Sequence, residues 1–343
     1  MKKISVILPV YNGVDTLESC VRSVISAGDR VAEIIIVDDG STDDTPEAAD
    51  KLASGEPLVK VLHTENHGCY AARKAGVRAS SSDYIAFADV DDGYVKGALD
   101  ALADLLEQYD ADIAIGGYRE VQSLKEQVRE EDRPAAGRVS PARMWRRIMK
   151  WKTQEFVCYV WNKLYKRELL EDLVTAEGIN QGEDVLITCQ AFTGAKKIVE
   201  TNRPVYLYVQ NHESLTRAGF GKSDLDLIRV WDLIVDVMKE KRPDLLYMAR
   251  FNRWRTDFTL ITRLILADDK ELDQKYAGEL KEWKRGLREH WKDLITPHAM
   301  PVNRELMVIG LRFFYLPSKL LMRLGRKLTK EKISVILHSG EKR

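Results

Sequence analysis

The sequence predicts an α/β protein with a mostly parallel central sheet, helices on both faces of that sheet, and a C-terminal helical region. Strand and helix signals alternate over the first 120 residues, which is typical of an open parallel sheet. Glu33–Val37 reads EIIIV, a continuous apolar run of the kind found in a strand that is buried on both faces. From about Ser223 onward the pattern becomes almost wholly helical.

The alternating series can be followed element by element. Thr16–Ser26 places Leu17, Val21 and Val24 on one face of a helix, which predicts that this face packs on the sheet. The same reasoning predicts strands at Ile4–Leu8, Glu33–Val37, Val59–His63, Tyr84–Ala88 and Asp112–Ile115, with helices at Thr16–Ser26, Pro46–Ala53, Tyr70–Ala79 and Val95–Gln108.

The remainder of the chain divides into a connecting part and a helical part. Gln122–Val139 is charged and carries Pro134 and Gly137, which predicts an exposed connection. We expect a first domain over residues 1–218 and a helical region over residues 219–343. Further elements are expected at Pro141–Lys150 (helix), Gln181–Thr193 (helix), Pro204–Val209 (strand), Asp224–Lys239 (helix) and Arg250–Leu266 (helix).

Composition narrows the functional classes. Lys and Arg together number 53, as do Asp and Glu, so overall charge favours neither nucleic acid nor a membrane surface as a partner. The four cysteines are widely scattered, which favours small buried thiols in a reducing cytoplasm over a zinc site or a disulfide framework. The apolar N-terminal run is short and followed by Pro9, so we interpret it as a strand and not as a signal peptide.

Polar residues follow three of the predicted strands at the point where each strand ends. These segments are Pro9-Val10-Tyr11-Asn12, Asp38-Asp39-Gly40-Ser41 and Asp89-Val90-Asp91-Asp92. Open parallel sheets bind ligands outside the carboxyl ends of their strands. The sequence therefore predicts a binding site at this edge of the sheet.

The segment Asp89-Val90-Asp91-Asp92 brings three carboxylates into four residues. Such crowded acids repel one another unless a cation lies among them, and oxygen ligands suit Mg²⁺ or Mn²⁺. The alternative is a solvated acidic turn that caps the next helix.

Three further features each allow a structural and a functional interpretation. Asp38 and Asp39 could cap a helix or accept a hydrogen bond from a base or ribose. Arg73 could reach a phosphate or pair with the acids that follow Tyr84–Ala88. Glu183 and Asp184 open a predicted helix, where acids favour the helix dipole, but a carboxylate there could also serve as a general base.

Six motifs resemble glycosyltransferase family 2, the inverting enzymes with the GT-A fold, and in particular its bacterial capsule and exopolysaccharide members. They are PVYNG, IIIVDDGSTD, ENHGCYAARKAG, DYIAFADVDD, VWNKLYKRELL and GEDVLITCQAF. They occur in the order of the family and cover roughly residues 3–215. Each motif alone is weak or moderate, but the ordered set is highly specific.

The resemblance implies roles for individual residues and for the domain halves. Asp184 matches the catalytic base, Asp91 and Asp92 match the acids that bind the divalent cation, and residues 1–120 and 121–218 match the nucleotide-binding and acceptor halves. His67-Gly68-Cys69-Tyr70 departs from relatives, which often carry smaller residues there. The nucleotide-sugar-binding positions are Pro9, Val10, Tyr11, Asn12, Asp38, Asp39, Arg73, Asp89 and Asp91, and those near the sugar or acceptor are Trp161, Asn162, Lys163 and Glu183.

The implied reaction is inverting transfer of a sugar from a nucleotide-diphosphate sugar to a hydroxyl of a glycan or lipid-linked sugar. The resemblance favours UDP as the nucleotide, with GDP and dTDP as the alternatives. Two other hypotheses stay open. A sugar-phosphate nucleotidyltransferase would share the sheet and the acidic loop, but it should carry a glycine-rich, basic loop where this chain has PVYNG. A non-catalytic nucleotide-sugar-binding protein would keep the pocket without the base.

The tail from Arg312 interleaves basic and apolar residues, as in an amphipathic helix that lies on an anionic membrane. This pattern suggests peripheral contact with the inner face of the cell membrane. A terminal helix packed on its own domain is the alternative. The basic residues are Lys319, Arg323, Arg326, Lys327, Lys330 and Lys332.

Overall fold

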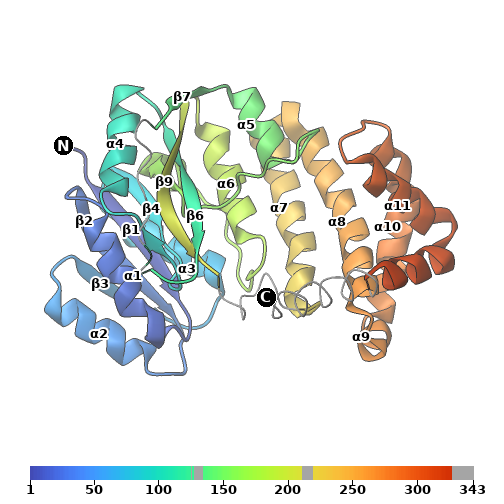
Figure 1. Ribbon diagram of the computed structural model, residues 1–343, viewed down its shortest axis with the longest axis horizontal. Helices are drawn as coiled ribbons and strands as arrows, with labels where there is room; N and C mark the ends of the chain where they lie inside the picture. The colour runs from blue at the N-terminus through green and yellow to red at the C-terminus, as the bar shows by residue number, and fades with distance from the viewer. Residues whose placement is uncertain (125, 127–133, 211–218, 327–343) are drawn as a thin grey trace, which may run out of the picture. The chain divides into compact units, whose positions relative to one another are not determined.

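The computed structural model describes residues 1–124, 126, 134–210 and 219–326, and its first part is a nine-stranded sheet with helices on both faces (Figure 1). The order of the strands is β3-β2-β1-β4-β8-β6-β9-β5, and β7 pairs with β9. Their bounds are β1 Ile4–Val10, β2 Val31–Asp39, β3 Val59–Thr64, β4 Tyr84–Phe87, β5 Gly93–Tyr94, β6 Ile113–Val121, β7 Ala136–Val139, β8 Lys163–Lys166 and β9 Ile198–Val209.

The sheet is parallel in its N-terminal part and mixed beyond it. Strands β3, β2, β1 and β4 pair in parallel, as the alternating sequence predicted. Strand β8 then enters antiparallel between β4 and β6, and β9 carries antiparallel β5 and β7. The expectation of a mostly parallel sheet therefore holds for the N-terminal strands and for the pair β6 and β9. The other pairings are antiparallel, because short strands without long apolar runs complete the sheet from distant segments.

Part of the expected connection at Gln122–Val139 is a strand. Ala136–Val139 forms β7 along β9, while residues 125 and 127–133 lie outside the described residues. The prediction of an exposed connection is wrong for these four residues. Their side chains alternate between exposed and half-buried, so the segment has no apolar run that would indicate a strand.

Helices cover both faces of the sheet. Alternate side chains of β1, such as Val6 and Leu8, lie in one core with α1 (Val14–Ser26), α2 (Thr45–Gly55) and α4 (Ala98–Gln108). On the opposite face, α3 (Cys69–Ala79) approaches so closely that a Cβ on Gly76 would lie 2.3 Å from Ile7 Cγ2. Helix α6 (Glu183–Gly194) packs beside α3, and α5 spans Pro141–Ile148.

The chain forms two compact units. The first comprises Met1–Ile148 and Val157–Arg217, and the second comprises Met149–Phe156 and Ala218–Arg343. The second unit is helical, as predicted, with a core that includes Phe251, Ile261 and Trp283. Its helices are α7 Asp226–Lys241, α8 Leu246–Ala267, α9 Lys270–Lys275, α10 Ala277–Ile295 and α11 Val302–Phe313, followed by helical residues 315–326.

Two expectations about the chain as a whole can be compared with the described residues. The four cysteines form no disulfide, and three of them are buried while Cys69 is half-buried. Among the described helices, none has the length and apolar character needed to cross a membrane.

Candidate active site

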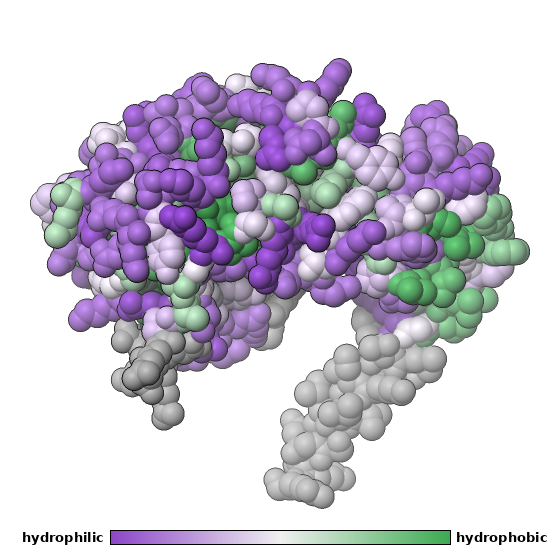
Figure 2. Space-filling view, turned by 90° about the horizontal axis from the view of Figure 1, so that it is seen from above, coloured by the Kyte–Doolittle hydropathy of each residue, from purple (hydrophilic) through white to green (hydrophobic). Residues whose placement is uncertain are grey.

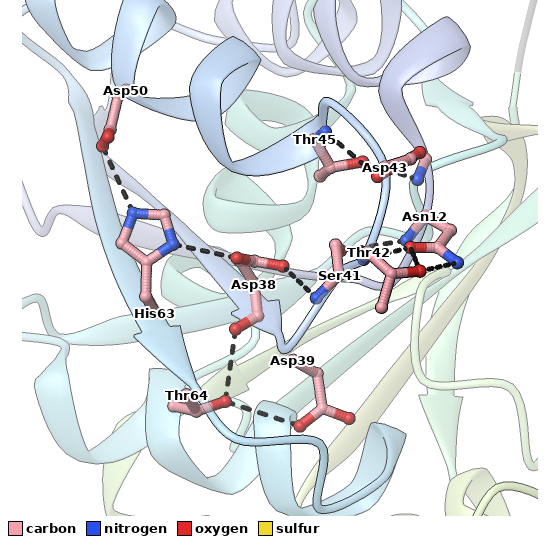
Figure 3. A network of polar contacts seen from close by, with 11 residues as sticks. Asn12, Asp38, Asp39, Ser41, Thr42, Asp43, Thr45, Asp50, His63 and Thr64 are labelled. Carbon is pink, nitrogen blue, oxygen red and sulfur yellow. Dashed lines mark hydrogen bonds and ion pairs between the residues drawn. The ribbon is translucent and has the colours of Figure 1, made fainter.

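Three strand ends meet at one edge of the sheet. Val10 is paired with Asp38 in the register of β1 and β2, and Ile7 is paired with Phe87 at the end of β4. Asn12 joins two of these ends, since its backbone N–H donates to Ser41 Oγ at 2.9 Å and its Oδ1 accepts from Thr42 N at 2.7 Å (Figure 3). The edge predicted from the sequence is therefore a single connected surface.

The PVYN segment presents one large side chain to solvent. Pro9 and Val10 are buried, whereas Tyr11 is 51% exposed. Asn12 has a φ of +53°, a left-handed conformation that asparagine tolerates better than most residues. This turn leaves the Tyr11 ring available at the edge of the sheet.

Asp38 and Asp39 are buried and hold turns (Figure 3). Asp38 accepts from Ser41 N at 3.0 Å and contacts His63 Nδ1 at 2.9 Å. Burial alone would raise the pKa of Asp38, but hydrogen bonds from Ser41 and His63 lower it below its usual value. The structure thus gives Asp38 a role in fixing its own loop.

Both oxygens of Asp39 accept hydrogen bonds from backbone amides, Oδ1 from His67 at 2.9 Å and Oδ2 from Gly68 at 2.8 Å. Gly68 has a φ of +88° and begins α3. The carboxylate therefore fixes the loop between β3 and α3, which contains the segment that departs from relatives.

The carboxylates that follow β4 are crowded. Burial and the charge of Asp89 raise the pKa of Asp91 above its usual value. Burial and the charges of Asp89 and Asp91 raise the pKa of Asp92 to about 9. Without a cation, this loop carries more negative charge than its surroundings favour.

Asp92 is the most buried of the three acids. Its Oδ1 accepts from Val209 N at 2.8 Å, which ties the loop to β9. Its Oδ2 is buried and makes no well-formed hydrogen bond in the described residues, although the neighbouring Tyr206 hydroxyl has a minor influence on its pKa. One carboxylate oxygen of Asp92 therefore holds the loop on β9, and the other can still accept a hydrogen bond or bind a cation.

Arg73 joins this loop to the start of α6. Its Nη2 donates to Asp89 Oδ1 at 2.6 Å, and its Nη1 donates to Asp184 Oδ1 at 2.8 Å and to Glu183 Oε1 at 3.2 Å. The guanidinium is only 2% exposed. Arg73 could have been free to reach a phosphate or paired with acids, and the structure shows ion pairs with acids. Two of these acids, Glu183 and Asp184, belong to α6 and were not predicted as its partners.

Glu183 and Asp184 begin α6, directly after Gly182 in a left-handed conformation. Burial raises the pKa of Asp184 to about 7, although the Arg73 guanidinium acts in the opposite direction. Burial also raises the pKa of Glu183. A carboxyl group with such a pKa exchanges a proton readily near neutral pH, as a general base must.

The block Trp161-Asn162-Lys163 is buried. Trp161 stacks on Tyr206 with ring centroids 4.5 Å apart, and Asn162 Nδ2 donates to Gly116 O at 2.8 Å. Lys163 donates to Asn162 Oδ1 at 2.9 Å, and burial lowers its pKa to about 8. These buried side chains pack beside Tyr206, which contacts the acidic loop, and they fix the backbone of the neighbouring strands.

Three residues of the site were absent from the sequence analysis. The Tyr206 hydroxyl accepts from Asp89 N at 2.9 Å, Val209 N holds Asp92, and the Tyr118 ring lies edge-on to Trp161 at 5.1 Å with 39% of the residue exposed. Alternating tyrosines on β9 were a possible signal. Only the pairing of β9 with β6 and β5 places them beside the acidic loop.

Metal binding by protein side chains alone has no support here. In residues 1–124, 126, 134–210 and 219–326, no three His, Cys, Asp or Glu side chains are grouped to hold an ion. Two carboxylates together with phosphate oxygens of a ligand are nevertheless sufficient for Mg²⁺ and similar ions. Asp91 and Asp92 fit that smaller requirement.

Comparison with known proteins identifies relatives of the chain. The model of the family "Glycosyl transferase family 2" matches residues 5–174. The chain is 32% identical over 220 residues to the uncharacterized glycosyltransferase EpsJ of Bacillus subtilis, covering 63% of this chain and 64% of EpsJ, somewhat less than two thirds of that relative. It is 31% identical over 248 residues to the glycosyltransferase GlyG of Streptococcus pneumoniae, covering 70% of this chain and 80% of GlyG.

Solved structures share the fold. S. aureus TarS residues 1–349 in complex with UDP-GlcNAc superpose with a TM-score of 0.65 and 19% identity, covering 96% of this chain and 92% of that one. The mannosyltransferase PcManGT of Pyrobaculum calidifontis, in complex with GDP-Man and Mn²⁺, gives a TM-score of 0.50 at 15% identity, covering 94% and 87%. These neighbours have the GT-A fold that the motifs implied. Motif order, fold and relatives agree, and the chain belongs to glycosyl transferase family 2.

Proposed function

We propose that this protein is an inverting glycosyltransferase that moves a sugar from a UDP-sugar to a hydroxyl of a glycan or lipid-linked sugar in cell-surface polysaccharide synthesis. The observation that carries the proposal is the buried Arg73 guanidinium, which binds Asp89 at the strand edge and Asp184 on α6 at once. This places the candidate base beside the acidic loop. Residues 1–120 form the nucleotide-binding half and 121–218 the acceptor half in this proposal.

The donor binds at the edge formed by β1, β2 and β4. The exposed Tyr11 ring packs against the base, and Pro9, Val10 and Asn12 fix the turn that presents it. Asp38 and Asp39 act by holding the adjoining loops, and Asp39 faces the base from there. Arg73 serves the donor indirectly, as the counter-ion of Asp89.

Asp91 and Asp92 are the residues that would hold Mn²⁺ or Mg²⁺. The fit rests on their raised pKa values and on the buried Oδ2 of Asp92, because a cation relieves the repulsion between the acids and supplies a partner for that oxygen. A bound divalent cation neutralises negative charge on the departing nucleotide diphosphate. PcManGT, which shares the fold, forms a complex with GDP-Man and Mn²⁺.

Asp184 takes the proton from the acceptor hydroxyl as that oxygen attacks the anomeric carbon from the face opposite the diphosphate. The C–O bond to the diphosphate breaks as the new glycosidic bond forms, so a single displacement inverts the anomeric configuration. Arg73 contacts Oδ1 of Asp184, which holds the carboxylate by one oxygen while the other accepts the proton. Glu183 contacts the same guanidinium at 3.2 Å, and its charge adds to the burial that raises the pKa of Asp184.

The acceptor lies beside the aromatic cluster around Trp161 in this proposal. Tyr118 is the exposed member of that cluster and can contact a sugar ring, while Asn162 and Lys163 fix the backbone beneath it. The resemblance to bacterial polysaccharide members supports a cytoplasmic enzyme at the inner face of the cell membrane. The C-terminal region would then contact that membrane as a peripheral element.

A donor panel tests the proposal. Thermal shift with Mn²⁺ should single out one nucleotide sugar, and free nucleotide diphosphate should be released only when an acceptor is present. If a donor binds but no nucleotide diphosphate is released, whichever acceptor is added, the protein is a non-catalytic binding protein. Release that is independent of acceptor would indicate hydrolysis of the donor in place of transfer. Formation of pyrophosphate from a nucleoside triphosphate and a sugar phosphate would instead indicate a nucleotidyltransferase.

The variant Asp184→Asn tests the base. We expect turnover to fall on the order of 10²–10⁴-fold with donor affinity retained, because only proton transfer is removed. In the unmodified protein, kcat/KM should rise with pH through about 7, as Asp184 ionises. Unchanged turnover in Asp184→Asn would exclude this assignment.

A further inference from the structure

The last two helical segments of the second unit carry an exposed apolar surface. We call it the C-terminal apolar face. Its members are between 47% and 75% exposed, and they are eight of the twelve large hydrophobic side chains that are exposed in the described part of the chain. Figure 2 shows hydrophobic residues gathered over this end of the molecule. The members are Val302, Leu306, Phe313, Phe314, Leu316, Leu320, Leu321 and Leu324.

Residues 315–326 turn their polar side inward. Lys319 Nζ lies 2.7 Å from Asp273 Oδ2, and Arg323 binds both Asp273 at 2.9 Å and Asp268 at 3.0 Å. Positions 315, 319, 322 and 323 share one side of a helix, so the leucines at 316, 320, 321 and 324 lie on the other side. The ion pairs thus hold the helix on its own unit with the apolar side outward.

These contacts change the role of two basic residues. The amphipathic pattern predicted that Lys319 and Arg323 face an anionic membrane, but both form ion pairs within the unit. The lysines at 327, 330 and 332 lie outside the described residues. In the described residues, contact with a membrane would therefore depend mainly on the exposed apolar side chains, and less on the basic ones.

Within residues 302–326, every exposed or half-buried charged residue is basic. Glu305 is the one acidic residue in 302–326, and it is buried and contacts His298 at 3.2 Å. Arg304 is exposed, and Arg312 and Arg326 are half-buried. An apolar surface with positive charges at its margin complements the anionic surface of a bilayer.

We propose that the C-terminal apolar face inserts into the headgroup and upper acyl region of a bilayer that contains anionic lipid. The inference deepens the membrane contact of the proposed function and rests on it for the cellular setting. A symmetric contact with a second copy would place the arginines of one copy against those of the other. The remaining tail, residues 327–343, begins with Lys327, Lys330, Glu331 and Lys332, a net positive segment that would meet the same repulsion.

The test is sedimentation of the full chain with vesicles of phosphatidylcholine alone and of phosphatidylcholine with phosphatidylglycerol. We expect binding to the mixed vesicles and weaker binding to the neutral ones. The triple variant Leu316→Ser/Leu320→Ser/Leu321→Ser should lower the partition coefficient by at least about ten-fold, because three leucines that would enter the bilayer are lost. Its thermal midpoint should stay unchanged, since these side chains are exposed.

The matched control Lys239→Ser/Glu240→Ser/Lys241→Ser alters exposed residues at the end of α7 and should bind vesicles as the unmodified protein does.

Several results would overturn the inference. One is equal binding by the leucine variant. Another is binding that is abolished by Lys327→Gln/Lys330→Gln/Lys332→Gln but not by the leucine variant, which would indicate charge alone. A third is a dimer in light scattering that the leucine variant dissociates, with no vesicle binding, which would identify a second copy as the partner. Donor binding measured on the same samples separates this inference from the proposed function, since loss of vesicle binding alone leaves the donor site intact.

Discussion

The acids that follow β2 and those that follow β4 lie at the same edge of one sheet, yet their surroundings differ. Asp38 and Asp39 accept hydrogen bonds from the loops that follow β2 and β3 and from His63. Asp91 and Asp92 have raised pKa values because burial and mutual repulsion are not offset by comparable donors. The comparison teaches that similar acidic motifs can have opposite surroundings. Hydrogen-bond donors fix the acids at one strand end, whereas the acids at the next repel one another, which is why we propose the cation site there.

The largest expected effect is a loss of donor affinity on substitution of an acid that follows β4. Asp91→Asn should weaken Mn²⁺-dependent donor affinity on the order of 100-fold, since loss of even an outer-sphere partner typically costs metal sites 10–100-fold. The same change should raise the thermal midpoint of the metal-free protein, because it removes a repelling charge. Calorimetry with and without Mn²⁺, together with thermal unfolding, measures both. Donor affinity equal to that of the unmodified protein would remove Asp91 from the cation site.

At the end of β2, where the acids accept hydrogen bonds, a substitution should change the stability of the fold. Asp39→Asn replaces one accepting oxygen by an amide that opposes the N–H of His67 or Gly68, so the free energy of unfolding should fall by about 1–3 kcal/mol. Denaturant unfolding measures this, with Asp91→Asn as the matched control at the other strand end. If Asp39→Asn left stability unchanged and altered only the response to Mn²⁺, the contrast between the two ends would be wrong.

The smallest effect concerns His63, which lies between Asp38 and Asp50. Its hydrogen bond with Asp38 raises the pKa of His63, so the pair stabilises the fold fully below about 6.5, the usual value, and less as pH rises through the raised pKa. Because His63 is well exposed, His63→Gln should cost less than about 1 kcal/mol at pH 5.5 and nothing at pH 9. Urea unfolding at both values checks this. A cost that grew with pH would contradict the ion pair.

The edge of the sheet where the polar residues gather was predicted well. The hydrophobic pattern locates each strand, and the order of the strands determines where they end. Buried apolar runs identified β1 to β4, and the carboxyl ends of parallel strands must meet at one edge. The expected helix at Tyr70–Ala79 is present as α3, and its Gly76 lies against Ile7 of the sheet. Local patterns of this kind need no knowledge of distant partners.

The long-range pairings could not be predicted. Whether Arg73 contacts a phosphate or the acids depends on where α6 lies, and nothing local to Arg73 specifies that. The contributions of Tyr206 and Val209 depend on β9 returning beside the acidic loop. At the C-terminus, the sequence revealed an amphipathic pattern but not which side faces outward, because ion pairs with α9 and with Asp268 decide it.

The central claim is that Arg73 fixes Asp184 across the bound sugar from the cation held by Asp91 and Asp92. A crystal structure with Mn²⁺ and the donor identified by the panel tests it most directly. We expect the cation on Asp91 and Asp92, and the Asp184 carboxylate facing the anomeric carbon on the side opposite the diphosphate. A donor bound with Asp184 on the same side as the diphosphate, or out of reach of the anomeric carbon, would contradict the account.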